Sequence, residues 1–238
     1  MDQLDRRFSL QAQWSRDLRT YIFRKYLHKE KISVLEIGSG TGSVLGCLSD
    51  EFSARIGPVI GIDKDPAAAV YAKRRKKEWN ICIGTGESLP FAGGHFDFVF
   101  CHYLLLWAEA PEEILREMKR VTAAGGICAA LAEPCYAEMT AAPDDLKQLA
   151  LQQRESLAER GADLSAGKKL GDLFRMIGFR TVEYGKYGTN PADAVFVQTE
   201  IGQMLRDTNR KSFIMDPEKT YHYTVPTYFA VAEKEEIE

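Results

Sequence analysis

The 238-residue sequence has no apolar run close to the roughly 20 residues that a membrane-spanning helix needs. Its five cysteines include no C-x-x-C pair, which argues against a structural zinc site and a disulfide framework. Its 19 glycines and 9 prolines follow no period, which excludes a collagen-like chain. The first residues lack the apolar stretch of a secretory signal, so we expect a cytoplasmic protein without a membrane span.

An excess of positive charge is also missing. The chain has 31 Lys and Arg residues against 34 Asp and Glu residues, a net charge of −3 near neutral pH. Such a chain lacks the basic surface of a general nucleic-acid binder, so we expect no nucleic-acid partner. With 45% hydrophobic residues the chain is too apolar to be disordered, and its length suits one domain with a substantial core.

Short apolar runs alternate with helical patterns along the chain. We expect strands at 32–37, 59–62, 80–84, 96–101, 127–132, 180–184 and 227–232. We expect helices at 8–30, 44–52, 66–79, 111–121, 140–166, 170–178 and 190–220. The alternation over the first five strands predicts a parallel sheet buried between helices.

A glycine-rich loop follows the first strand. Residues 36–42 read Glu-Ile-Gly-Ser-Gly-Thr-Gly, and a helical pattern begins directly after them. Glycines let the backbone turn tightly and approach a ligand closely. A dinucleotide-binding loop would have a third glycine where Ser43 stands, and it has no use for a carboxylate at Glu36, beside a negative pyrophosphate. A carboxylate at this position favours a cationic ligand.

Polar residues follow three more of the expected strands. Asp63 ends the second strand, where its carboxylate can accept hydrogen bonds from ribose hydroxyls. The turn at 84–91 follows the third strand, and its backbone can contact the edge of an adenine. His102 and Tyr103 follow the fourth strand, at the end of the sheet where open α/β proteins bind ligands.

These motifs together resemble the class I S-adenosylmethionine-dependent methyltransferases, in particular the small-molecule branch similar to ubiquinone and menaquinone biosynthesis enzymes, called type 11. The resemblance rests on the glycine-rich loop, Asp63, Glu-Ser-Leu-Pro-Phe at 87–91, Phe-Asp-Phe-Val at 96–99, the helix at 113–121 and the turn at 125–126. It implies an α/β, Rossmann-like fold with a seven-stranded, mostly parallel sheet in the order 3-2-1-4-5-7-6. Strand 7 is antiparallel, helices cover both faces, and helical lid segments are inserted.

The resemblance also implies a set of cofactor contacts. The methionine part of S-adenosylmethionine would lie on Glu36, Gly38, Ser39, Gly40 and Gly42; the ribose on Asp63; the adenine beside Lys64, Thr85, Gly86 and Glu87; and the sulfonium over Cys101, His102 and Tyr103. Arg16 or Arg19 could pair with the cofactor's carboxylate. Many relatives have an aspartate where Thr85 stands; a threonine can accept a hydrogen bond from the adenine amino group but adds no charge.

The implied organisation is a single methyltransferase domain over residues 1–238. Its parts are an N-terminal helical segment (1–30), a cofactor-binding core (31–133), two lid insertions over the acceptor site (134–168 and 188–222), and a last strand with an acidic tail (223–238). We expect a small-molecule methyl acceptor and no metal ion. The product would be S-adenosylhomocysteine.

Two residues are catalytic candidates, His102 as a general base and Tyr103 beside it. Cys135 follows the fifth strand as the nucleophile of some RNA methyltransferases does, but the second cysteine motif of those enzymes is missing. Three alternatives stay open: a non-catalytic S-adenosylmethionine-binding protein of the same fold, a nicotinamide-dependent oxidoreductase, and a methyltransferase with a macromolecular acceptor.

Overall fold

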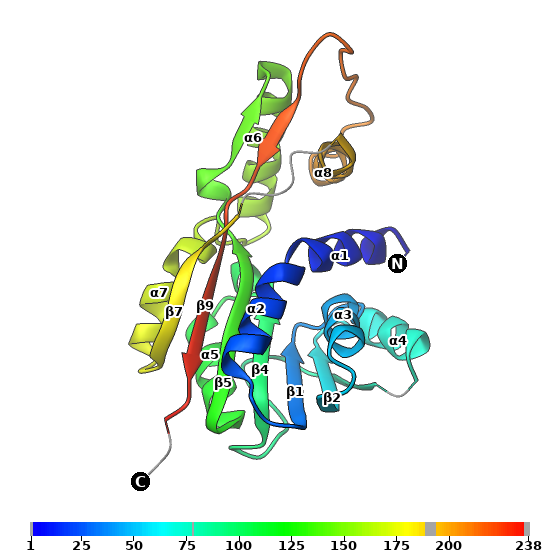
Figure 1. Ribbon diagram of the computed structural model, residues 1–238. Coiled ribbons are helices and arrows are strands. Elements are labelled where there is room, and N and C mark those ends of the chain that lie inside the picture. The colour runs from blue at the N-terminus through cyan, green and yellow to red at the C-terminus, as the bar shows by residue number, and fades with distance from the viewer. Residues whose placement is uncertain (1, 78, 189–193, 236–238) are drawn as a thin grey trace.

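The computed structural model describes residues 2–77, 79–188 and 194–235 (Figure 1). A seven-stranded sheet forms its centre, in the order β3-β2-β1-β4-β5-β9-β7. The strands are β1 (Ile32–Ile37), β2 (Ile56–Asp63), β3 (Asn80–Ile83), β4 (Phe96–His102), β5 (Thr122–Pro134), β7 (Arg180–Tyr187) and β9 (Thr227–Glu233). Since β7 and β9 are the sixth and seventh strands of this sheet, the expected order 3-2-1-4-5-7-6 is confirmed. β9 runs antiparallel to both of its neighbours, as expected.

Helices cover both faces of the sheet. They are α2 (Arg16–Tyr26), α3 (Ser43–Glu51), α4 (Pro66–Arg75), α5 (Pro111–Val121) and α7 (Ala166–Met176). Successive residues of β1 enter different cores: Val34 packs with side chains of α2 and α3, while Leu35 packs with side chains of α5 and α7. Burial on both faces explains why the central strands are apolar without alternation.

The helix boundaries follow local signals. The Asp65 side chain caps α4, with its Oδ1 accepting from the Ala67 N–H at 2.8 Å, and Pro66 opens the first turn. The basic residues at 73–75 close α4, where cations suit the helix dipole. The helix expected at 66–79 ends at Arg75, and Glu78 lies outside the described residues.

The N-terminal segment contains two helices and not the single helix expected at 8–30. α1 spans Asp2–Trp14 and α2 begins at Arg16. The hydroxyl of Ser15, between them, contacts the carbonyls of Gln11 and Ala12 and also the side chains of Arg19 and His102. Serine side chains that bond to backbone carbonyls one turn earlier bend helices, and here the bend turns α1 across the end of the sheet (Figure 1).

The two segments expected as lids are only partly helical. α6 (Asp144–Glu159) and α8 (Ala194–Asp207) are shorter than the helices expected at 140–166 and 190–220, and residues 189–193 lie outside the described residues. A two-stranded sheet of β6 (Thr140–Ala142) and β8 (His222–Thr224) joins their ends. The first of these helices starts later than expected because residues 140–142 pair with residues 222–224.

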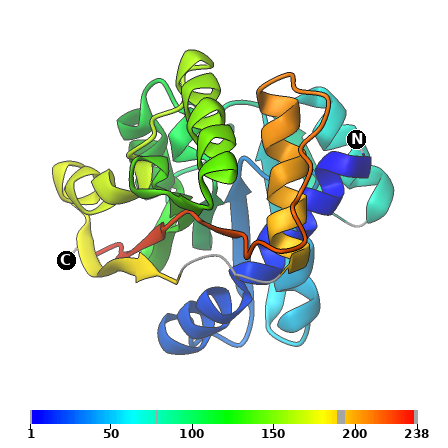
Figure 2. The ribbon, with the colours of Figure 1, turned by 90° about the horizontal axis from the view of Figure 1, so that it is seen from above.

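The elements α6, α8, β6 and β8 share an apolar cluster that is separate from the cores on the two faces of the large sheet. It includes Leu149 from α6, Met204 from α8 and Tyr223 from β8. Two short 3-10 turns, Leu105–Trp107 and Tyr136–Glu138, follow β4 and β5. Figure 2 shows from above that α1, α6 and α8 spread across the end of the sheet that α1 crosses. Within the described ranges, no helix combines the length and apolar character needed to cross a membrane.

Candidate functional site

A cavity of about 330 Å³ lies where the central parallel strands end, beneath α1, α6 and α8. One side, here called the loop side, is lined by Glu36, Gly38, Ser39, Gly40, Asp63, Lys64, Thr85, Gly86 and Glu87. The other, here called the aromatic side, is lined by Arg7, Tyr103, Leu106, Trp107, Tyr136, Leu157, Arg160, Gln203 and Asp207. Ligands of open α/β sheets bind at this end of the strands.

The glycine-rich loop has backbone angles that require glycine. Gly38 and Gly42 have φ values of 71° and 75°. A Cβ on Gly42 would lie 2.4 Å from the Trp79 ring, and one on Gly38 would lie 2.7 Å from the Leu104 side chain. Gly42 therefore serves the packing of the loop, and it is not among the described residues that line the cavity.

Asp63 holds the loop in place from the end of β2. Its Oδ2 accepts from the Gly40 N–H at 2.7 Å, and its Oδ1 accepts from the Asp65 N–H at 2.8 Å. Each carboxylate oxygen has a second lone pair, so both can accept a further hydrogen bond from a ligand in the cavity. The structure thus gives Asp63 a loop-fixing role that the sequence did not indicate.

Glu36 brings a buried carboxylate to the loop side. Only 2% of the residue is exposed, and burial raises its pKa well above the usual value, against the attraction of Arg19. Its Oε2 has no hydrogen-bond partner among the described residues. A buried carboxylate oxygen beside a cavity is stabilised by a ligand that brings a donor or a cation. These features fit the ammonium group of a bound methionine moiety.

The two candidate arginines lie behind the cavity. Arg19 is completely buried and donates to the Ser15 hydroxyl at 2.8 Å and to the Ala12 carbonyl. It also forms an ion pair with Glu51, as the exposed Arg16 does. Neither arginine is among the described residues that line the cavity.

His102 also lines the cavity. Its Nε2 lies 2.9 Å from the Ser15 hydroxyl. Burial, together with the nearby Arg19 charge, lowers its pKa to about 3. The imidazole is therefore neutral at physiological pH and a weak base, which favours a hydrogen-bonding role.

Tyr103 begins the loop after β4 with a φ of 52°, a left-handed conformation that is uncommon for a tyrosine. Burial raises the pKa of its hydroxyl well above the usual value, so the group stays protonated. Cys101, one residue before His102, is fully buried in β4 and is not among the described cavity-lining residues.

Glu133 is a site residue that the sequence analysis missed. This fully buried carboxylate at the end of β5 accepts from the backbone N–H groups of Leu104 and Leu105 at 2.8 and 3.1 Å. It therefore holds the loop that carries Tyr103, although it does not itself line the cavity. Burial raises its pKa to about 7. A glutamate at the end of an otherwise apolar strand is the signal that could have identified it.

Cys135, two residues further on, is buried, and desolvation is the main reason that its pKa is raised. That environment disfavours a thiolate nucleophile. In the part of the chain that the structure describes, no group of three or more His, Cys, Asp and Glu side chains could hold a metal ion.

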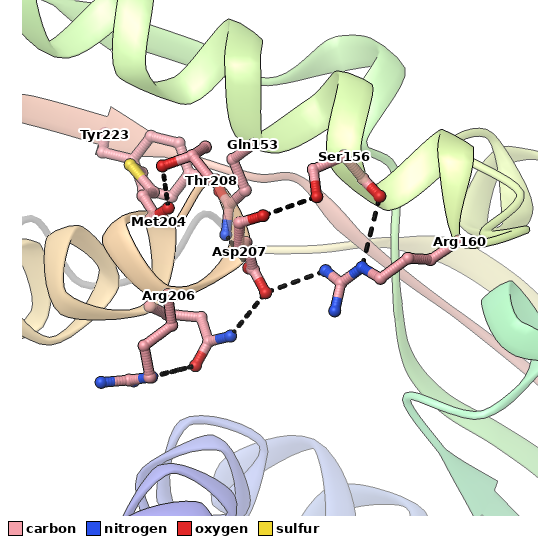
Figure 3. Close-up of polar contacts among 9 residues, drawn as sticks. Gln153, Ser156, Arg160, Met204, Arg206, Asp207, Thr208 and Tyr223 are labelled. Atoms are coloured by element: carbon pink, nitrogen blue, oxygen red, sulfur yellow. Dashed lines mark hydrogen bonds and ion pairs between the residues drawn. The ribbon is translucent and has the colours of Figure 1, made fainter. Parts of the chain in front are cut away.

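α6 and α8 are joined by polar contacts around Asp207 (Figure 3). Its Oδ1 accepts from Arg160 and Gln203, both at 2.8 Å, and its Oδ2 accepts from Gln153 at 2.9 Å. The Asp207 carbonyl accepts from Ser156 at 2.6 Å. Arg160 also lies over the Trp107 ring, 5.6 Å from its centroid. This network links the two helices over the aromatic side, and no sequence motif announced it.

The sequence has recognisable relatives. Demethylmenaquinone methyltransferase of Lactococcus lactis is 28% identical over 66% of this chain and 69% of its own length. Malonyl-[acyl-carrier protein] O-methyltransferase of Legionella pneumophila is 26% identical over 50% of this chain and 43% of its own length. A protein of Methanocaldococcus jannaschii is 32% identical and is matched over 49% of its length, so the chain spans between 43% and 69% of the length of these three relatives.

The fold has solved counterparts as well. A Methanosarcina mazei structure described as a SAM-dependent methyltransferase superposes with a TM-score of 0.61 at 16% identity, covering 90% of this chain and 97% of that one. At this identity the likeness shows the fold alone. Residues 35–130, which contain the glycine-rich loop, Asp63 and His102, match the methyltransferase domain family of type 11. These residues are therefore a methyltransferase domain of the type 11 family, built on the class I fold.

Proposed function

We propose that this chain is an S-adenosylmethionine-dependent methyltransferase that methylates a small molecule. The observation that carries the proposal is the loop side of the cavity. There, Glu36 has an unpartnered buried oxygen, and the glycine-rich loop is held to Asp63. When bound, S-adenosylmethionine supplies a methyl group activated by a positively charged sulfur.

Different residues of the loop side would bind different parts of the cofactor. Glu36 would hold the ammonium group, and Asp63 would accept from the ribose hydroxyls. Lys64, Thr85, Gly86 and Glu87 would lie along the adenine, since all of them line this side. Arg19, buried behind Ser15, would act through that hydroxyl as a positioning residue for His102.

The aromatic side would hold the acceptor. The cavity volume of about 330 Å³ is in the range of small-molecule sites, which supports a small acceptor over a macromolecule. His102 and Tyr103 face it as hydrogen-bonding groups, because the first is a weak base and the second stays protonated. Alignment of the acceptor for in-line displacement and exclusion of water would then supply most of the rate enhancement.

The proposal is tested by calorimetric titration of the wild type and the Glu36→Gln variant with S-adenosylhomocysteine. The variant keeps the shape of the side chain but loses the charge that would hold the ammonium group. We expect affinity to fall by about tenfold or more, the usual size of a lost charge-assisted hydrogen bond. Binding of 5′-methylthioadenosine, which has no amino-acid part, should stay unchanged.

Asp172→Asn is the matched control, because Asp172 is exposed and pairs with Arg175 across one helical turn. It should leave both affinities at the wild-type values. Folded wild-type protein that binds NADH but neither S-adenosylhomocysteine nor S-adenosylmethionine would contradict the proposal and favour an oxidoreductase. Cofactor binding without turnover of any acceptor in a broad panel would favour the non-catalytic alternative.

A further inference from the structure

The aromatic side of the cavity carries a cation, Arg7, that the cofactor assignment does not use. Arg7 reaches the aromatic side from α1. Its Nε is buried and has no hydrogen-bond partner among the described residues. A buried guanidinium with an unpartnered donor at a cavity wall is costly unless a ligand supplies an acceptor.

The surroundings of Arg7 keep it charged. Burial works against its charged form, but the attraction of Glu200, Tyr136 and Asp207 outweighs burial and raises its pKa. Among the described residues, no carboxylate forms an ion pair with Arg7.

The nearby carboxylates are not positioned to neutralise Arg7 directly. Asp207 accepts from Arg160, Gln153 and Gln203, as Figure 3 shows for the first of these. Glu200 is 4% exposed, and burial raises its pKa against the attraction of Arg7; among the described residues it forms no ion pair with that guanidinium. The Tyr136 hydroxyl is a hydrogen-bond partner of Arg7, but the Nε–H has none among the described residues, so Arg7 keeps an unused donor at the cavity wall.

Arg7 is also separate from the charges of the loop side. The cation that acts on Glu36 is Arg19, whereas the groups that act on Arg7 are Glu200, Tyr136, Asp207 and Tyr103. Beside Arg7, the aromatic side carries the rings of Tyr103, Trp107 and Tyr136 and the side chains of Leu106 and Leu157. Because aromatic rings pack favourably against one another, a ligand that satisfies both features has an aromatic body and a negatively charged end.

We propose that the aromatic side binds a methyl acceptor that is an aromatic organic acid, with its carboxylate held by the guanidinium of Arg7. This assignment rests on the proposed methyltransferase function. A planar guanidinium can bind a carboxylate through two parallel hydrogen bonds, which fixes the direction of the ligand as well as its affinity. The acid would thereby point its opposite end toward His102 and the loop side.

The test compares acids with their neutral amides of the same shape. Protein saturated with S-adenosylhomocysteine is titrated with 4-hydroxybenzoate and 4-hydroxybenzamide, and with 2-naphthoate and 2-naphthamide, and each titration is repeated without S-adenosylhomocysteine. We expect at least one acid to bind the wild type about tenfold more tightly than its amide. Arg7→Gln should abolish that preference, and Arg7→Lys should restore part of it. Arg6→Gln, a change at the neighbouring exposed arginine, should keep it.

The outcomes are distinct. The proposal is overturned if no acid of the panel binds better than its amide, or if Arg7→Gln leaves the preference intact. It is also overturned if Arg7→Gln lowers the affinity for S-adenosylhomocysteine tenfold, because Arg7 would then bind the carboxylate of the ligand's amino-acid part. Failure of the wild type to bind S-adenosylhomocysteine would instead refute the methyltransferase function, while the acid and amide titrations without it still decide the role of Arg7.

Discussion

Glu133 is a buried acid whose protonation depends on the fold. Burial raises its pKa from 4.5 to about 7, and the N–H groups of Leu104 and Leu105 only partly oppose this shift. Between these two pH values the folded protein keeps a proton that the unfolded chain has released. The contribution of the protonated Glu133 side chain to the free energy of unfolding is therefore complete below pH 4.5 and is lost as the pH rises through about 7.

The Glu133→Gln variant should remove this dependence, because glutamine can accept the same backbone hydrogen bonds and does not titrate. Between pH 5 and pH 8 the free energy of unfolding of the wild type should fall by about 2 to 3 kcal/mol more than that of the variant. Urea unfolding of both proteins at the two pH values measures the difference. Parallel pH dependences would show that Glu133 ionises normally.

The sequence identified the residues of the loop side better than it identified the role of each residue. Glu36 and Asp63 could be singled out because a carboxylate beside a glycine-rich loop is conspicuous in sequence. Arg19 could not be excluded from the cavity by sequence, because its direction depends on the bend at Ser15. The functions assigned to all of these residues stay predictions until binding is measured.

At the scale of the element, amphipathic and apolar patterns located most helices and strands. α5 is a good example: its buried residues Ile114, Leu115, Met118 and Val121 are spaced for one helical face. The patterns failed at 8–30, where a hydroxyl bends the helix, and at 140–142, where a remote strand pairs. The second failure arises from an interaction between distant segments, which a local pattern does not contain, whereas the first arises from a serine hydroxyl that contacts carbonyls three and four residues earlier.

The network at Asp207 should determine how firmly α8 is held. Asp207→Asn removes the charge that faces Arg160 and places an amide among donors, at a side chain that is 4% exposed. We expect about 2 kcal/mol less stability for the α6–α8 pairing, or roughly 30-fold faster amide hydrogen exchange in α8, with the central strands unchanged.

Hydrogen exchange read out by mass spectrometry checks this prediction. Asp172→Asn is again the control, because it removes an aspartate that is exposed and has one surface ion pair. Exchange in α8 that is equal in both variants would mean that apolar contacts, such as those of Met204, hold the helix without help from Asp207.

At the scale of the whole molecule, segments from both ends of the chain meet over one cavity. α1 comes from the first residues, and α8 comes more than 180 residues later. Both contribute side chains to the cavity wall, Gln11 from the former and Gln203 from the latter. A ligand that fills the cavity therefore connects elements that the sheet alone does not join.

Saturating S-adenosylhomocysteine should protect α1 and α8 together with the loop side. At 100 times its dissociation constant it should add about 2.7 kcal/mol to the free energy of unfolding. Hydrogen exchange with and without the ligand locates the protection, and α7, which contributes no described residue to the cavity wall, is the internal control. Protection limited to residues 36–87 would show that α1 and α8 do not close over the ligand.

The parallel sheet, the glycine-rich loop and the end of the sheet that carries the cavity followed from sequence patterns, and the strand order followed from the resemblance to class I methyltransferases. Apolar runs, helix caps and glycines act locally, and the rules of parallel sheets place their loops at one end. The aromatic side was decided only by the tertiary structure. Arg7 and Asp207 look like ordinary surface charges in sequence, because burial and pairing depend on the segments that fold over them.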